Sequence, residues 1–316
     1  MAGYSLGIDL GGRSAKFGLF DKEGKLINKS NIVTRTEENG KYILPDIYNH
    51  ILKILEKYNL KEEDLIGIGM GVPGAVIDES TILSGVNLGW GNINIKDYFK
   101  NIMDVEFKLA NDANLAALGE QWMGAGKNYK NIVMVTLGTG VGGGIIIDGD
   151  IYSGPTGSAG EIGHIPILEK DSDITCGCGR KRCFELVASA TGLENLANEH
   201  LFESDEKSSL RRIDSILAKD VFDQYKLGDK LAGQILDKYY QYLGRGLASV
   251  AAVVDPEAFV IGGGVSNAGP ILLEGIRREF LKNCFPTLVN TDFLLASLAN
   301  DAGIYGAARL VLKGEK

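Results

Sequence analysis

The apolar residues of this chain fall into short runs that end in glycine and into longer segments with helical spacing. The run Ile66–Val72 has the length of a buried strand and ends at Pro73-Gly74, while Pro45–Tyr58 places apolar residues three and four positions apart. Strands that alternate with helices predict an α/β protein. The strands predicted in the first part are Leu6–Gly12, Lys16–Asp21, Lys25–Thr34, Ile66–Val72 and Val105–Ala110, and the helices are Pro45–Tyr58 and Ala113–Ala125.

The second part of the chain repeats the arrangement of the first. Ile132–Leu137 and Ile145–Asp148 flank a glycine-rich segment at 138–144, as the first two predicted strands flank a glycine pair. A duplicated strand–turn–strand unit predicts two domains. The remaining predicted elements are the helices Leu231–Val254, Gly269–Asn283 and Ala302–Leu312 and the strands Ala258–Ile261 and Asp292–Leu298.

The composition of the 316 residues is that of an ordinary globular protein, with 45% hydrophobic and 23% charged residues. A formal net charge of -8 disfavours nucleic acid or an anionic membrane as the main partner. No apolar run approaches the ~20 residues of a membrane span and no signal peptide precedes the first strand, so we expect a soluble, cytoplasmic protein. Four cysteines in such a chain favour reduced thiols or a metal site over a disulfide framework.

Three of the four cysteines and one of the three histidines lie in one short segment of the chain. Three sulfurs and one imidazole are a complete tetrahedral ligand set for structural zinc. The cysteines have glycine, arginine and lysine as neighbours, which is unusual for thiols buried in a core, so that alternative is less favoured. We therefore predict that His164, Cys176, Cys178 and Cys183 bind zinc.

Glycine is over-used, with 42 residues, and the excess gathers around the predicted strands. At Asp9 and Gly11-Gly12, backbone N–H groups could approach a phosphate and a carboxylate could hold Mg²⁺, although a plain hairpin turn explains these residues equally well. The segment 138–144, which contains the hydroxyl of Thr139, more strongly predicts a phosphate-binding turn. The cluster 262–264 lies between a strand and a helix, where a base or ribose could bind. Neither a Walker loop nor a dinucleotide fingerprint occurs.

Polar residues that could act on a sugar lie in two places. Asp112 falls at a strand-to-helix junction beside Asn111, where by itself it is explained best as a helix N-cap. Glu161, His164 and Glu185 lie in or beside the zinc segment and could bind several adjacent hydroxyls. Transfer of a phosphoryl group to a hydroxyl needs a carboxylate that accepts the proton, which favours a catalytic role for Asp112.

Together these motifs resemble the ROK family of sugar kinases and repressors, within the actin-like ATPase superfamily, and in particular its bacterial glucokinase branch. The resemblance covers essentially the whole chain. The segments that carry it are Asp9-Leu10-Gly11-Gly12, Gly71-Val72-Pro73-Gly74, Asn87-Leu88-Gly89-Trp90, Asn111-Asp112-Ala113-Asn114, 138–144, the zinc signature and Val260-Ile261-Gly262-Gly263-Gly264.

The resemblance implies an α/β, two-domain actin-like ATPase (ribonuclease H-like) fold with a cleft between the domains. The small domain would be residues 1–110, completed by a helix at about 301–316, and the large domain residues 111–300 with the zinc loop. The implied activity is ATP-dependent phosphorylation of a hexose, in the first place glucose at its 6-hydroxyl, by a homodimer or homotetramer that uses Mg²⁺ and structural Zn²⁺. By the same resemblance Asp112 would be the general base, and the sugar hydroxyls would be bound by Asn111, Glu161, His164 and Glu185. Asp9 would help to place Mg²⁺, and the ATP phosphates would be held by Gly11, Gly12 and Thr139. The nucleoside pocket would be lined by Gly262 and Gly263.

Three positions depart from the family pattern. Arg13 replaces a threonine whose hydroxyl is a phosphate ligand in relatives. Either Ser14 beside it substitutes, or the guanidinium contacts phosphate or obstructs ATP, and we expect a functional but slower kinase. Arg182 replaces a glycine, which costs roughly 1 kcal/mol if the position requires positive φ. Ala299 replaces another glycine, but the two residues that follow it are retained, and we expect little effect.

Three alternatives stay open at this point. An N-acetylmannosamine or N-acetylglucosamine kinase or a fructokinase would use the same scaffold, although Asn87-Leu88-Gly89-Trp90 resembles the glucokinase branch. A sugar-responsive repressor is disfavoured because the first strand begins almost at Met1, which leaves no room for a helix-turn-helix. A catalytically impaired sugar sensor is suggested by Arg13, whereas the retained Asp9, Asp112 and Thr139 argue against it.

Overall fold

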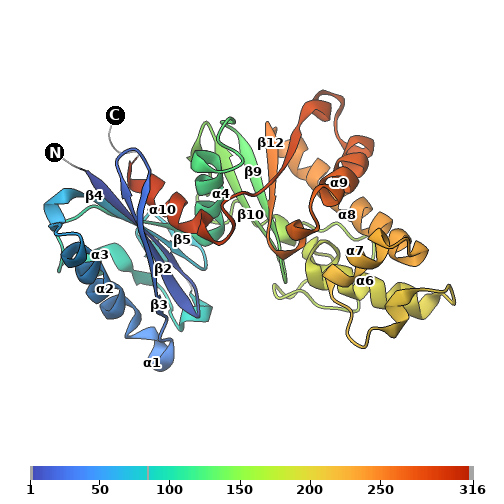
Figure 1. The fold of residues 1–316 in the computed structure, drawn as a ribbon, viewed down its shortest axis with the longest axis horizontal. Helices are drawn as coiled ribbons and strands as arrows, with labels where there is room; N and C mark the ends of the chain where they lie inside the picture. The colour runs from blue at the N-terminus through green and yellow to red at the C-terminus, as the bar shows by residue number, and fades with distance from the viewer. Residues whose placement is uncertain (1–2, 84, 313–316) are drawn as a thin grey trace. The chain divides into compact units, whose positions relative to one another are not determined.

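The computed structural model describes residues 3–83 and 85–312, and its chain contacts form two compact units (Figure 1). Of the described residues, unit 1 takes those in Met1–Asn128, Gly144–Ala159 and Leu298–Lys316, and unit 2 those in Tyr129–Gly143 and Gly160–Ser297. The predicted α/β class is confirmed. The division into functional domains of residues 1–110 with 301–316, and of 111–300, stays a prediction.

A five-stranded sheet forms the centre of unit 1. Helix α2 packs Ile47, Ile51 and Ile54 into one core with residues of the strands, and α10 lies against β1 and β4 (Figure 1). β1, β4 and β8 are parallel, so their carboxyl ends meet at one edge of the sheet. The order is β3-β2-β1-β4-β8, with β1 Tyr4–Leu10, β2 Ser14–Asp21, β3 Leu26–Val33, β4 Leu65–Val72 and β8 Phe107–Asn111, and the helices are α1 Glu37–Gly40, α2 Ile43–Lys57, α3 Ile95–Lys100, α4 Asp112–Met123 and α10 Ala302–Leu312.

Helix α10 rests directly on the sheet because the strands below it carry glycines. A Cβ atom at Gly7 of β1 would lie 2.0 Å from the carbonyl oxygen of Ile304, and one at Gly69 of β4 would lie 1.9 Å from that of Ala307. No side chain fits at such distances, so the helix backbone itself covers the strands. Some of the glycines therefore allow α10 to pack against the sheet, whereas the sequence analysis assigned the glycine clusters to turns and strand ends.

A second five-stranded sheet runs in the order β11-β10-β9-β12-β13, in which β9, β12 and β13 are parallel. Unit 2 contains β9, β12, β13 and the first three residues of β10. The strands are β9 Ile132–Leu137, β10 Val141–Ile147, β11 Asp150–Ile151, β12 Ala258–Gly262 and β13 Asp292–Leu295, and the helices are α5 Glu185–Ala188, α6 Ala190–Glu203, α7 Ala218–Lys226, α8 Lys230–Val254 and α9 Pro270–Asn283.

The predicted helices and strands are confirmed to within a few residues at most ends, with two corrections. The predicted turn 138–144 is too long, because β10 already begins at Val141 and the turn comprises only Gly138–Gly140. The strand predicted for Asp292–Leu298 ends at Leu295. The short sheet β5-β6-β7 (Val76–Ile77, Thr81–Ile82 and Ile93–Asn94) and helices α3, α6 and α7 were not individually predicted.

Among the described helices none has the combination of length and apolarity that crossing a bilayer requires, and this includes the 25-residue α8.

Ala299 has a backbone φ of 50°, in the left-handed region, which a residue with a Cβ atom adopts only at a cost. The sequence analysis noted that relatives have glycine here and expected little effect of the replacement, whereas the positive φ supplies a physical reason for one. Glycine should relieve the steric cost while losing some entropy, so we predict that Ala299→Gly raises the free energy of unfolding by up to about 1 kcal/mol.

Urea titration of Ala299→Gly beside Ala116→Gly measures this effect. Ala116 lies in the interior of α4, where glycine should cost about 1 kcal/mol. Two variants destabilised alike would contradict the assigned role of the backbone at residue 299.

Candidate functional site

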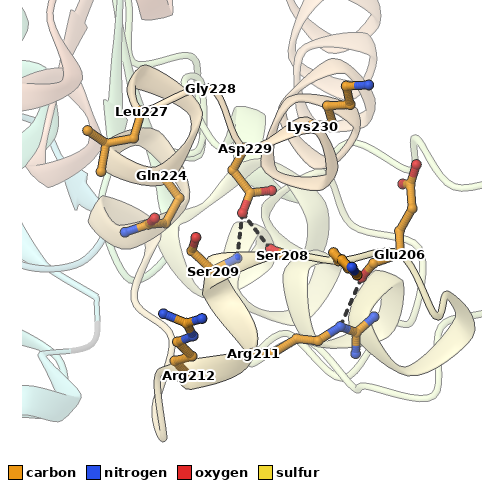
Figure 2. Close-up of a pocket in the computed structure, with 11 residues that line it drawn as sticks. Glu206, Ser208, Ser209, Arg211, Arg212, Gln224, Leu227, Gly228, Asp229 and Lys230 are labelled. Atoms are coloured by element: carbon orange, nitrogen blue, oxygen red, sulfur yellow. Dashed lines mark hydrogen bonds between the residues drawn. The ribbon is translucent and has the colours of Figure 1, made fainter.

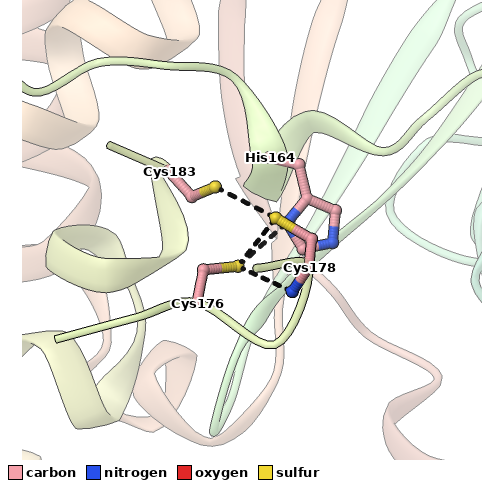
Figure 3. Close-up of side chains that lie close together, drawn as sticks. All are labelled: His164, Cys176, Cys178 and Cys183. Atoms are coloured by element: carbon pink, nitrogen blue, oxygen red, sulfur yellow. Dashed lines mark hydrogen bonds between the residues drawn. The ribbon is translucent and has the colours of Figure 1, made fainter. Parts of the chain in front are cut away.

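Four side chains of unit 2 that could bind a metal ion converge on one point (Figure 3). The ligand atoms of His164, Cys176, Cys178 and Cys183 all lie within 4.8 Å of one another. Cys176 Sγ lies 3.2 Å from Cys178 Sγ and 3.4 Å from His164 Nδ1, and Cys178 Sγ lies 3.4 Å from Cys183 Sγ. One imidazole and three thiols at this spacing fit the tetrahedral donor set of structural zinc.

A tight turn brings the cysteines together. The backbone N–H of Gly179 donates to the carbonyl of Cys176, and that of Cys176 donates to the carbonyl of Arg180, both at 2.8 Å. Gly179 has a φ of +83°, which glycine adopts without steric cost. The sequence Cys-Gly-Cys-Gly-Arg therefore folds locally so that the two sulfurs face the same side.

The charges around the three thiols favour the thiolate form at Cys178, the exposed one of the three. The Arg180 guanidinium, whose Nε lies 3.4 Å from Cys178 Sγ, lowers the pKa of that exposed thiol to about 6. Burial raises the pKa of Cys176 and of Cys183 above the ordinary value of a thiol, and the Glu185 carboxylate adds to the effect at Cys176. A bound metal ion would supply the positive charge that the two buried thiolates need.

The ring of His164 separates the cysteine cluster from a carboxylate. Its Nδ1 faces Cys176, whereas its Nε2 lies 3.7 Å from a carboxylate oxygen of Glu161. On the other side, Glu185 Oε1 lies 2.8 Å from Cys176 Sγ and 3.8 Å from His164 Nδ1. With Nδ1 on a metal, the neutral ring carries its proton on Nε2 and becomes a hydrogen-bond donor on the side of Glu161.

Two glycines allow the loop that carries Glu161 and His164 to rest on β10. A Cβ atom at Gly143 would lie 2.5 Å from the carbonyl oxygen of Gly160, and one at Gly163 would lie 2.2 Å from that of Val141. Gly143 was predicted to belong to a phosphate-binding turn. The structure instead uses it for packing, because only backbone can approach backbone so closely.

The shortened turn Gly138–Gly140 faces the carboxylate of Glu185. One hollow of about 290 Å³ is lined by Thr139, Gly140 and Glu185, together with the hydroxyl residues Ser189 and Thr191 near the start of α6. A Cβ atom at Gly140 would lie 2.7 Å from Glu185 Oε2. The structure thus brings together Thr139 and Glu185, which the sequence assigned to phosphate and to sugar.

The third glycine cluster lies at the same edge of the sheet. Gly263 follows β12 with a φ of +82°, and a Cβ atom there would lie 2.5 Å from the carbonyl oxygen of Leu137 at the end of β9. Because β9 and β12 are parallel neighbours, Thr139 and Gly262-Gly263 extend from the same ends of adjacent strands. That edge is where open α/β sheets bind ligands.

In unit 1, Asp9 lies near the carboxyl end of β1, opposite Lys16 of β2 and beside Gly71 of β4. Lys16 Nζ lies 3.1 Å from Asp9 Oδ2 and donates to the carbonyl of Asn300 at 3.0 Å. The sequence analysis missed Lys16. Its cross-strand position opposite Asp9 in a predicted hairpin was the available signal.

The junction of β8 and α4 separates the roles of Asn111 and Asp112. Asn111 Oδ1 accepts from the backbone N–H groups of Ala113 at 3.0 Å and Asn114 at 3.2 Å, so Asn111 is the N-cap of α4. Its Nδ2 donates to the carbonyl of Gly74 at 3.1 Å. Asp112 Oδ1 also accepts from the N–H of Ala113, at 2.8 Å, whereas Asn111 accepts from two N–H groups and is the N-cap. The Asn111 amide has a second N–H that can donate to a ligand.

Arg182 stabilises the zinc loop rather than straining it. Its φ is outside the left-handed region, so the cost considered for this position does not arise. Its guanidinium donates to the carbonyl of Leu168 at 2.8 Å and to that of Glu169, and its own carbonyl accepts from the N–H of Ile167 at 2.9 Å.

A hollow of about 650 Å³ elsewhere in unit 2 contains none of the predicted residues (Figure 2). Asp229 accepts there from the hydroxyl of Ser208 at 2.8 Å and from the N–H of Ser209 at 2.6 Å, and it also caps α8. Arg211 donates to the carbonyls of Leu201, Ser204 and Glu206. These charged groups hold their own loop, so the hollow is not a candidate active site.

The two-sheet α/β architecture with glycine-turn hairpins is that of the actin-like ATPases, and sugar kinases are among the structural relatives that share it. A sequence model of the ROK family matches residues 5–314, and the chain belongs to this family.

Relatives match over nearly the full length. The chain is 39% identical to a glucokinase of Halalkalibacterium halodurans, over 99% of this chain and 96% of that protein. It is 35% identical to a glucokinase of Thermotoga maritima, over 97% and 96%. Among solved structures, a ROK family glucokinase from Streptomyces griseus in complex with glucose and AMPPNP is 31% identical, covers 97% of this chain and 98% of its own, and superposes with a TM-score of 0.71.

We predict that the purified protein contains about one zinc ion per chain and that Cys183→Ser removes most of it, because Cys183 is a buried member of the four-ligand set. Elemental analysis measures the metal, and thermal unfolding should show a lower transition temperature in the variant. Cys284→Ser is the matched control, since Cys284 lies outside the cluster. Equal zinc in all three proteins would contradict the assignment.

We also predict that Gly140→Ala weakens sugar binding about tenfold, because the added methyl group displaces the Glu185 carboxylate and one charged hydrogen bond is lost. Calorimetric titration with the sugar measures the change. Gly138→Ala adds the same group in the same turn where no atom lies within 4 Å, and should leave sugar affinity unchanged. An equal loss in both variants would show that the turn, and not Glu185, is disturbed.

Proposed function

We propose that this protein is an ATP-dependent hexose kinase that phosphorylates the 6-hydroxyl of glucose. Membership of the ROK family and the near full-length similarity to glucokinases support the reaction class. A solved ROK glucokinase that holds glucose and an ATP analogue supports the two ligands. The roles of individual residues are those that the resemblance to the family implies, and the geometry within each unit supports them.

We assign proton abstraction from the 6-hydroxyl to Asp112. The observation that carries this assignment is that Asn111, and not Asp112, caps α4. Asp112 lies at the end of β8 next to the glycine-rich end of β4, and a Cβ atom at Gly71 would lie 3.7 Å from its Cα. The N–H of Ala113 donates to Asp112 Oδ1 at 2.8 Å and so orients the carboxylate, and a carboxylate held at this edge can act as a general base.

Recognition of the other hydroxyls is assigned to Glu161, His164 and Glu185, with the remaining N–H of Asn111. Carboxylates accept hydrogen bonds from adjacent hydroxyls, and the Nε2–H of His164 donates one. Zinc on His164 and the three cysteines would fix the ring and the loop and would take no part in the transfer. A loop held in this way would lower the entropy cost of orienting the sugar.

Phosphate binding is assigned to two turns. Asp9 offers carboxylate oxygens, the ligands that Mg²⁺ prefers, and the adjacent Lys16 supplies positive charge. Gly11, Gly12 and Thr139 would hold the phosphates of ATP. Gly262 and Gly263, at the next strand end, would face the nucleoside.

Replacement of Asp112 by asparagine tests the catalytic assignment. We expect ADP formation in the presence of glucose to fall by about 10²–10⁴-fold, because the side chain keeps its size but can no longer accept the proton. Glucose and nucleotide affinity and the unfolding temperature should change little, since Asn111 still caps α4. A variant that keeps its turnover would refute Asp112 as the base.

The same assay with N-acetylglucosamine, N-acetylmannosamine, mannose and fructose establishes the substrate. A preference for one of these would leave the mechanism intact and change the sugar. Turnover with none of them, together with measurable sugar affinity, would identify a sensor instead. The slower rate expected from Arg13 and a homodimeric or homotetrameric state stay predictions.

A further inference from the structure

We propose that Thr34 positions the turn between β1 and β2 for binding the phosphates of the nucleotide, by holding that turn open. The inference rests on the proposed function, because it takes ATP or ADP as the bound anion. Thr34 follows β3 directly and is 8% exposed. Its hydroxyl donates to the carbonyl of Gly11 at 2.7 Å, and its backbone N–H donates to the carbonyl of Arg13 at 3.0 Å.

The bond from Thr34 replaces one that a regular hairpin would make. Facing residues of a hydrogen-bonded pair normally exchange two bonds. Gly11 N–H does donate to the carbonyl of Ser14 at 3.0 Å, but in residues 3–83 and 85–312 the reverse bond from Ser14 N–H is not made. Neither Gly12 nor Arg13 has the positive φ of the usual two-residue hairpin turns. The turn is therefore open, and the Gly11 carbonyl faces Thr34.

The direction of the carbonyls fixes the direction of the amides. A trans peptide points its C=O and N–H to opposite sides. Since the carbonyls of Gly11 and Arg13 both point to Thr34, the N–H groups of Gly12 and Ser14 point away from it. In the described part of the chain, neither N–H donates to a backbone carbonyl of a turn or loop. Neighbouring N–H groups that face one way form a concave site for an anion.

The charges near the turn favour phosphate. Gly12 and Arg13 are exposed, so an anion can reach the amides and the guanidinium together. Asp9, the nearest carboxylate on β1, would repel an anion by itself, but it is paired with Lys16 at 3.1 Å. The ligand that matches this set is the diphosphate or triphosphate of a nucleotide, while AMP lacks the outer phosphates.

The positioning role of Thr34 makes a prediction that a purely structural role does not make. Without the hydroxyl, the Gly11 carbonyl is free to accept from Ser14 N–H, so the hairpin closes and this carbonyl still accepts one hydrogen bond. Stability should then change little, while one amide turns inward and is lost to the anion. The expected signature is a loss of affinity that is confined to nucleotides with outer phosphates.

The test compares Thr34→Val, which keeps the shape, with Thr34→Ser, which keeps the hydroxyl. Calorimetric titrations of the full-length protein with ADP, ATP and AMP should show Kd for ADP and ATP about tenfold higher in Thr34→Val and near wild type in Thr34→Ser. AMP and glucose affinity should be unchanged. Thr291→Val is the matched control, because Thr291 is also buried and its hydroxyl donates to a backbone carbonyl, that of Pro256, in unit 2.

Unchanged ADP and ATP affinity in Thr34→Val, with a wild type that binds both, would overturn the inference and leave the kinase function standing. An equal loss for AMP, or a matching loss in Thr34→Ser, would also overturn it, since the effect would not depend on outer phosphates or on the hydroxyl. A wild type that binds neither ADP nor ATP would overturn the proposed function itself.

Discussion

The contact between strand β10 and the loop of Glu161 and His164 is the constraint on which the candidate site depends. At Gly143 and Gly163 the strand and the loop approach so closely that no Cβ atom fits between them. This contact sets the height of the loop above the sheet. The position of His164, the fourth side chain of the candidate metal cluster, follows from that height.

The cluster of three cysteines and His164 would hold the loop, while the neighbouring carboxylates would contact a ligand. His164 turns Nδ1 to the thiols and Nε2 to Glu161, so one ring belongs to both the candidate metal cluster and the neighbouring polar group. A metal ion that fixes the ring also fixes which nitrogen carries the proton. Rigid orientation of donors and acceptors is the contribution that a phosphoryl-transfer enzyme most needs from its protein, because the chemistry itself requires little covalent assistance.

The two units use backbone in similar ways at their strand ends. In unit 2 the turn Gly138–Gly140 and Gly263 lie at the ends of neighbouring parallel strands, and in unit 1 the turn at 11–14 follows β1. Each offers N–H groups where a phosphate could bind. Thr34 and Lys16 show that residues outside the glycine motifs orient the turn and set its charge.

The sequence by itself predicted most of the elements, the four side chains of the candidate metal site and the candidate polar residues, since periodicity, cysteine spacing and helix-junction chemistry are local properties. It could not separate Asn111 from Asp112, because which of two adjacent residues caps a helix depends on backbone angles. The sequence analysis also placed Gly143 in a turn and missed Thr34, and both errors have one cause. Close backbone contacts and hydrogen bonds between distant residues arise only when the chain has folded, and they leave no periodic pattern in the sequence. Tertiary structure therefore decided which glycines pack, which residue caps and which turn stays open.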